Sequence, residues 1–185
     1  MKRRIFSALL LTFLTICASS QVFLTRNAKV TFFSKAPVEK IEAVNNEVTS
    51  VLNTAKGEFG FVVLIKSFKF KKALMEEHFN ENYMESNTYP KANFKGNITD
   101  LSTVNFGKDG TYSVNVKGDM ILHGVTKSME VPGTITISKG NISVTSKFNL
   151  KLKDYNIKIP STVINNISEI VDITLDSKYE PYKKS

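Results

Sequence analysis

The chain has 185 residues, 42% of them hydrophobic, and its formal net charge is +8 at pH 7. This length suits one domain with a sizeable core. The only cysteine is Cys17. A protein that has lost its first 20 residues therefore has no thiol for disulfides, metal binding or nucleophilic catalysis.

The first 20 residues have the pattern of a secretory signal peptide. Three basic residues at positions 2–4 precede an apolar stretch at 5–16, and the small residues at 18–20 suit a cleavage site. The apolar stretch is shorter than the about 20 residues of a transmembrane helix. We therefore predict a signal peptide at 1–20, a mature domain at 21–185, and a periplasmic or secreted location.

Cleavage would lower the formal charge from +8 to +5, because the three basic residues leave with the signal peptide. The densest basic cluster is four lysines within 66–72, interleaved with Phe68 and Phe70. Basic strands with aromatics can bind single-stranded nucleic acid. Lysines that alternate with core aromatics are more typical of a solvated strand face, so we expect no nucleic-acid partner. A weak contact with an anionic membrane surface and a homodimer are the macromolecular partners that we consider.

The mature chain begins with short strands. Residues 28–34 and 37–44 have β-like patterns, and the second alternates in polarity. The pair Asn45-Asn46 predicts a turn before another strand at 48–52, since asparagine favours turns.

The strongest strand is predicted at 58–70, after a turn at Gly57. Its two faces are both apolar up to Ser67, where the pattern changes phase, so both faces need a cover. Residues 72–84 have the apolar spacing of a helix, which Asn87 and Pro90 end. We expect this helix to lie against the outer face of the sheet, near the end of the long strand. The face of odd-numbered residues carries Phe59, Phe61, Val63 and Ile65, and the other face carries Val62 and Leu64.

Further strands are predicted at 92–101, 142–152 and 169–177, and two more flank the reversal at 122–127. On either side of that reversal, apolar residues occupy every second position, as in antiparallel strands with one buried face. Gly118 and Gly133 are in the same register. The apolar residues are Tyr112, Val114, Val116, Met120 and Leu122 before it, and Met129, Val131, Ile135 and Ile137 after it.

The pattern thus predicts an all-β domain of about eight antiparallel strands with one helix packed outside. Closing the sheet into a barrel would remove its edges. An eight-stranded barrel is either filled by side chains or holds one small ligand. A β-sandwich with a solid core fits the same alternation equally well.

The mature chain offers little for catalysis. Its two histidines, His78 and His123, have no metal-ligating partner at the spacing of a zinc site. No glycine-flanked serine elbow occurs. Glu169 shares the parity of an apolar face, where it is either a rim residue or a contact for a ligand headgroup. We predict no catalytic residue, no metal and no cofactor, and hence no enzyme.

Two stretches resemble the YceI-like family of exported lipid- or polyisoprenoid-binding proteins. One is Ile65-Lys66-Ser67-Phe68 with residues 73–79 (ALMEEHF) and 89–94 (YPKANF). The other is the reversal LHGVTK at 122–127. The resemblance covers nearly all of the mature chain, but residues 37–52 lack the family's "KH" element after the first strand.

The resemblance implies a lipocalin-like extended antiparallel barrel with an elongated apolar tunnel, which holds a long isoprenoid or fatty chain for transport or storage. Such a bound lipid is a ligand rather than a cofactor. The alternative function is an interaction or adhesion module of the cell envelope, built as a β-sandwich without a cavity. For His123, Thr126 and Lys127, either a turn role or a headgroup contact fits. The expected ligand-binding residues are the in-register apolar ones: Phe61, Val63, Ile65, Phe94, Val114, Val116, Met120, Leu122, Phe148, Leu150, Val171 and Ile173.

Overall fold

The computed structural model describes residues 21–182, and the predicted signal peptide lies outside these residues. Most of the described chain is strand, connected by short helices and turns. The strands are β1 (Val22–Lys35), β2 (Lys40–Asn53), β3 (Glu58–Leu64), β4 (Lys69–Phe70), β5 (Lys91–Ile98), β6 (Gly110–Leu122), β7 (Val125–Ser138), β8 (Asn141–Lys151) and β9 (Ile170–Pro181). The helical segments are η1 (Ile65–Ser67), α1 (Ala73–His78), η2 (Phe79–Tyr83), η3 (Leu101–Thr103), η4 (Leu152–Tyr155) and η5 (Ser161–Val163).

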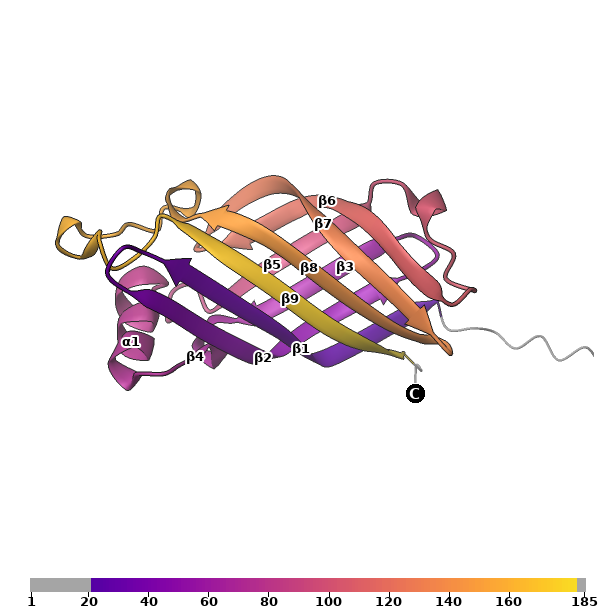
Figure 1. Cartoon of the computed structure of the whole chain (residues 1–185), viewed down its shortest axis with the longest axis horizontal. Coiled ribbons are helices and arrows are strands. Elements are labelled where there is room, and N and C mark those ends of the chain that lie inside the picture. Colours follow the sequence, from indigo (N-terminus) through magenta and orange to yellow (C-terminus); the bar gives the residue numbers. More distant parts are fainter. Residues whose placement is uncertain (1–20, 183–185) are drawn as a thin grey trace, which may run out of the picture.

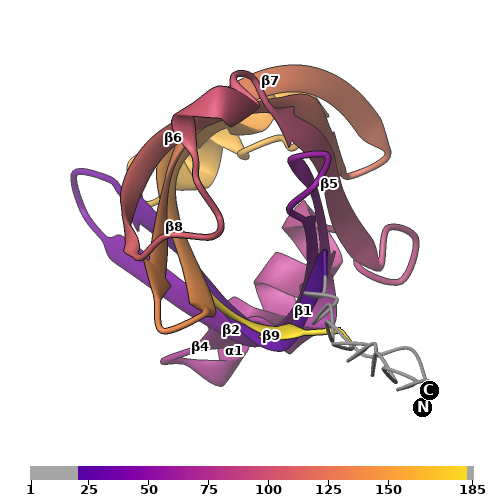
Figure 2. The same ribbon diagram turned by 90° about the vertical axis from the view of Figure 1, so that its right-hand side faces the viewer.

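Eight strands close into a barrel (Figures 1 and 2). Their order is β1-β9-β8-β7-β6-β5-β3-β2, and pairing of β1 with β2 completes the ring; β4 adds a short pairing to β2. All of these pairings are antiparallel. Because every strand of the ring has two neighbours, the fold is the predicted barrel, and the β-sandwich is excluded.

The connections divide the barrel into two ends. The β1–β2, β3–β5, β6–β7 and β8–β9 connections meet at one end together with α1, which we call the helix end (Figure 1). The β2–β3, β5–β6 and β7–β8 connections lie at the other end, where β1 begins and β9 ends, and we call it the terminal end. Figure 2 looks along the barrel from the terminal end, with α1 behind.

The turn predicted at Asn45-Asn46 is wrong, because β2 runs through it. The Asn45 side chain is fully buried: its Nδ2 donates to the Leu64 carbonyl at 2.8 Å, and its Oδ1 accepts from the Glu47 amide at 2.8 Å. The register of β1 against β2 shifts nearby, between Thr25 and Val30. The asparagine therefore stabilises an irregular place in a continuous strand pair.

The long strand predicted at 58–70 ends at Leu64, and the change of phase near Ser67 corresponds to η1. Its outward residues Val62 and Leu64 stay exposed, so the expected cover is absent there. The helix does lie near the end of this strand and outside the ring. However, its apolar residues line the cavity at the helix end rather than the outer face of the sheet.

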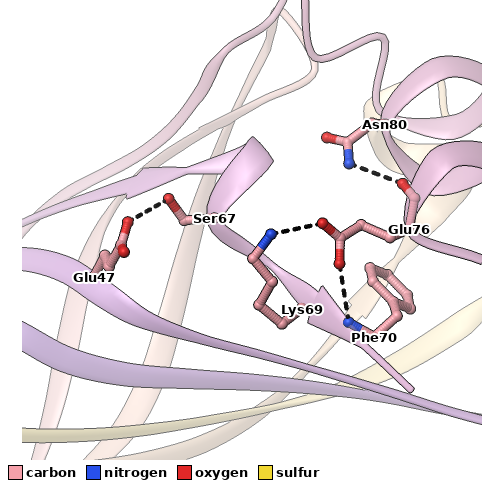
Figure 3. Close-up of polar contacts among 6 residues, drawn as sticks. All are labelled: Glu47, Ser67, Lys69, Phe70, Glu76 and Asn80. Atoms are coloured by element: carbon pink, nitrogen blue, oxygen red, sulfur yellow. Dashed lines mark hydrogen bonds and ion pairs between the residues drawn. The ribbon is translucent and has the colours of Figure 1, made fainter. Parts of the chain in front are cut away.

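Polar contacts hold the helix to the barrel (Figure 3). The Glu76 carboxylate accepts from Lys69 Nζ at 2.7 Å and from the Phe70 amide at 3.4 Å, which ties α1 to β4. Asn80 Nδ2 donates to the Glu76 carbonyl at 2.8 Å. The hydrogen bond from Lys69 lowers the pKa of the Glu76 carboxyl below its ordinary value, against the effect of desolvation.

Two glycines let β5 and β6 approach closely on the inner face. Gly96 pairs with Gly118 across the two strands. A Cβ on Gly118 would overlap the Lys95 carbonyl oxygen and the Gly96 Cα, and one on Gly96 would lie 2.7 Å from the Lys117 carbonyl oxygen. A larger residue at either position would therefore push the strands apart.

Candidate functional site

The barrel encloses an apolar cavity of about 500 Å³ that reaches the surface at the helix end. The side chains of β3, β5, β6, β8 and β9 line it in alternation, because every second residue of a strand points to the same face. Leu74, Met75, His78 and Phe79 of the helical segment contribute the part nearest the surface. A volume of this size is typical of ligand pockets.

All twelve residues predicted from the alternation lie on the wall of this cavity. Their predicted role is to contact a ligand, and that role stays a prediction. From β3 to β5 they are Phe61, Val63, Ile65 and Phe94; from β6, Val114, Val116, Met120 and Leu122; from β8 and β9, Phe148, Leu150, Val171 and Ile173.

The cavity does not run through the whole barrel, because a packed core fills the terminal end. Fully buried Leu52 and Ile135 belong to this core and do not line the cavity. The β5–β6 connection adds Val104, with Leu101 and Phe106 packed beside it. The elongated tunnel expected from the resemblance is therefore closed at the terminal end.

A buried hydrogen bond lies within this closed end. Ser50 Oγ and Tyr179 Oη are 2.6 Å apart, and both residues are buried. Burial raises the pKa of the Tyr179 hydroxyl, while its hydrogen bond with Ser50 acts in the opposite direction. The phenol therefore stays neutral and joins β2 to β9 across the irregular part of β1.

Four phenylalanines near the mouth of the cavity were not among the predicted site residues. Phe79 of the helical segment stacks on Phe32 with ring centroids 5.6 Å apart, and contacts Phe68 and Phe70 at 5.6 and 5.0 Å. All four rings line the cavity. The sequence signals were the phase change after Ser67 for Phe68 and Phe70 and the helical spacing for Phe79. Neither signal showed that β1 and the helix would meet there.

The charged and titratable side chains on the cavity wall are gathered at its mouth. Lys72 Nζ lies 3.2 Å from Glu39 Oε1, and His78 and Asn166 lie on the same rim. Ser34 also lines the cavity, but its hydroxyl accepts from the Ser168 amide at 2.8 Å and so ties the β8–β9 connection to β1. A ligand with an apolar chain and a polar headgroup would thus fit with its headgroup at the helix end.

The barrel wall has a gap between β7 and β8 on the side of the helix end. Their ladder runs from Ser138–Asn141 only to Gly133–Ser146, so residues 125–132 and 147–151 are not paired with each other. The segment at 152–157 covers this gap, and its Leu152 and Ile157 line the cavity.

His123 fixes that covering segment in place. It forms the turn between β6 and β7 with Gly124, both at positive φ (50° and 73°), as a two-residue hairpin turn requires. The His123 ring is buried, and its Nδ1 lies 3.0 Å from the Tyr155 carbonyl oxygen. The centroids of the His123 and Tyr89 rings are 4.5 Å apart. His123 Nε2 is 3.3 Å from Glu85 Oε1, without the alignment of a hydrogen bond. His123 therefore has a structural role in the turn.

Thr126, Lys127 and Glu169 are exposed and do not line the cavity, and a headgroup contact by these three residues stays a prediction. Asp172 also faces outward, where its carboxylate accepts from Asn149 Nδ2 at 2.6 Å. Within residues 21–182, no group of three His, Cys, Asp or Glu side chains could hold a metal ion. No helix in the same range is long and apolar enough to cross a membrane.

These features define a lipocalin-like closed barrel with an apolar cavity open at one end. The YceI-like domain model matches residues 20–179, and the chain belongs to the YceI-like family. No match to this chain was found among curated proteins.

Solved structures share the fold. A polyisoprenoid-binding domain from Saccharophagus degradans, implicated in plant cell wall breakdown, has a TM-score of 0.75 at 19% identity, over 88% of this chain and 99% of that one. BcnA from Burkholderia cenocepacia has a TM-score of 0.68 at 18% identity, over 83% of this chain and 96% of that one. The YceI protein from Campylobacter jejuni has a TM-score of 0.54 at 15% identity, over 76% and 84%.

Proposed function

We propose that this protein is a non-catalytic lipid-binding protein, which holds a long isoprenoid or fatty chain in its barrel as a carrier or store. The observation that carries the proposal is the apolar cavity with one open end, whose charged and titratable lining residues lie only at its mouth. The similarity to a polyisoprenoid-binding domain supports the same class of ligand.

The energetics favour a chain-like ligand. Each methylene removed from water contributes about 0.8 kcal/mol, so ten buried methylenes contribute about 8 kcal/mol before the cost of association is subtracted. No specific polar contact is needed along the chain. The headgroup would stay near Glu39, Lys72 and His78, where water can still solvate it.

We further propose that the protein works outside the cytoplasm, in the periplasm or after secretion. The support is the pattern of the first 20 residues, with a basic start, a short apolar stretch and small residues before Gln21. Sequencing the N-terminus of the protein purified from each cell fraction tests this part. An intact Met1 on protein found only in the cytoplasm would contradict it.

The binding function is tested on protein purified from its native compartment. Organic extraction followed by mass spectrometry should find a long-chain lipid or isoprenoid in roughly stoichiometric amount. Delipidated protein should gain thermal stability when polyprenyl or fatty chains are added. Neither bound lipid nor any thermal shift would overturn the proposal.

A further inference from the structure

Exposed apolar side chains are concentrated at the helix end of the barrel. Val38 is 70% exposed, Leu74 59% and Ile164 46%, and they come from the β1–β2 hairpin, α1 and the β8–β9 connection. The turns at 54–57, 99–109 and 139–140, within the described part of the chain, have no exposed large apolar side chain. The connections at the helix end therefore expose large aliphatic side chains and the turns at the terminal end do not, while Tyr182, next to the end of β9, is 49% exposed. Figure 1 shows where the two sets of connections lie.

These three side chains belong to one connected surface. The Val38 amide donates to the Asn165 carbonyl at 3.0 Å, which places the hairpin beside the segment that carries Ile164. The ion pair between Lys72 and Glu39, at 3.2 Å, joins the start of the helix to the same hairpin. We call Val38, Leu74 and Ile164 the apolar rim.

The apolar rim is continuous with the mouth of the cavity. Leu74 is exposed and also lines the cavity, and Val163 lines the cavity beside Ile164. A flat apolar surface placed on the rim would therefore cover the opening. A chain could then enter or leave the cavity without crossing water.

The charges around the rim suit an anionic surface. Exposed lysines flank all three segments of the rim. Of the acidic residues on these segments, Glu39 is paired with Lys72 and Glu76 with Lys69, while Glu77, Glu81, Asp154 and Glu169 are exposed. Aliphatic tips surrounded by lysines match the boundary between lipid headgroups and acyl chains of an anionic membrane. The lysines are Lys35, Lys40, Lys71, Lys72 and Lys158.

We propose that the helix end docks on the surface of an anionic lipid bilayer, with the apolar rim inserted at the level of the headgroups. This proposal deepens the proposed function. It rests on that function in one respect: docking would serve to exchange a lipid chain between the cavity and the bilayer. Docking itself needs only the rim and the lysines.

The test is flotation of residues 21–185 with vesicles of phosphatidylcholine and phosphatidylglycerol. The double variant V38S/I164S removes two rim residues that do not line the cavity. We expect its partitioning onto vesicles to fall about tenfold or more. The matched control V51S/V62S changes outward side chains of β2 and β3 that are 38% and 37% exposed and lie away from the apolar rim, and it should bind like the unchanged protein. Vesicles of phosphatidylcholine alone, or high salt, should weaken binding of all three proteins.

Equal binding by the rim variant and the unchanged protein, or no flotation of the unchanged protein at all, would overturn the docking proposal. Uptake of a fluorescent long-chain fatty acid, measured without vesicles, separates this result from the proposed function. Protein that takes up the chain but does not float contradicts docking alone. Protein that floats but takes up no chain contradicts the cavity function and leaves the docking surface standing.

Discussion

Replacing Val116 with phenylalanine tests whether the closed-ended cavity holds a chain. Val116 points inward from β6, lines the cavity and belongs to the core that fills the terminal end. The added ring would occupy the deeper part of the cavity, on the side of the terminal end. It should therefore shorten the usable depth without affecting the mouth.

The size of the effect follows from the burial of methylenes. In the unchanged protein, each added CH₂ should improve binding of a fatty acid by about 0.8 kcal/mol, or about fourfold, until the chain reaches the floor. If the phenylalanine ring displaces two methylenes, the longest chains lose about 1.6 kcal/mol, or about fifteenfold. Short chains that never reach Val116 should bind as before. Titration with fatty acids of increasing length, by displacement of a fluorescent chain, measures both effects.

Ile135→Phe is the matched control, because Ile135 lies in the packed core that closes the cavity at the terminal end. Ile135 is fully buried in the same core but does not line the cavity. Its substitution should overpack the core and cost about 1–3 kcal/mol of unfolding free energy. Val116→Phe should lower the unfolding free energy by clearly less than Ile135→Phe does. An equal loss of stability in both variants, with an unchanged dependence on chain length, would refute the closed-ended cavity.

Three further substitutions test the scaffold. Gly118→Ala should lower the unfolding free energy by about 1–3 kcal/mol in denaturant titrations, because the new Cβ would meet the backbone of β5. Gly60→Ala is the control, since a Cβ there meets nothing within 4 Å, and it should be nearly neutral. Equal losses in the two variants would contradict the close approach of β5 and β6. Tyr179→Phe should cost about 1–3 kcal/mol by leaving the buried Ser50 hydroxyl unpaired, and a second change of Ser50 to alanine should recover part of the loss. Because its pKa is lowered in the folded protein, ionised Glu76 stabilises the fold above about pH 4.5, and this contribution is lost as the pH falls through the lowered value. Glu76→Gln should therefore reduce the loss of unfolding free energy on acidification. An unchanged dependence of unfolding free energy on pH would show that the Glu76–Lys69 ion pair contributes nothing.

The alternation of apolar residues predicted which face of each strand points inward, and every predicted lining residue lies on the cavity wall. The same alternation could not separate cavity from core. Val116 and Ile135 have equivalent patterns, yet only Val116 borders open space. The difference comes from the β5–β6 connection, whose Val104 packs into the terminal end. No local pattern in the sequence says which end of a barrel a loop will fill.

Asn45 and Phe79 show the other limit of local patterns. Asn45 has the preference of a turn residue, but a hydrogen bond to the Leu64 carbonyl keeps it inside a strand. Phe79 fits the apolar side of a helix, but its partners Phe32 and Phe70 come from two separate strands. In both cases the deciding contact joins residues that are distant in sequence, and only the closed barrel brings them together.

The two stretches that carry the family resemblance meet in space at the helix end. The Tyr89 ring contacts His123, and a Cβ on Gly124 would lie 2.6 Å from Tyr89. Yet neither Tyr89 nor His123 lines the cavity. These motif residues therefore fix the turn and the cover over the gap in the wall, while the ligand would be selected by cavity depth and by the rim. We accordingly expect His123→Ala to lower stability and loosen the segment at 152–157, as hydrogen exchange would measure, and to leave the dependence of affinity on chain length unchanged. A changed dependence on chain length would instead place His123 in ligand selection.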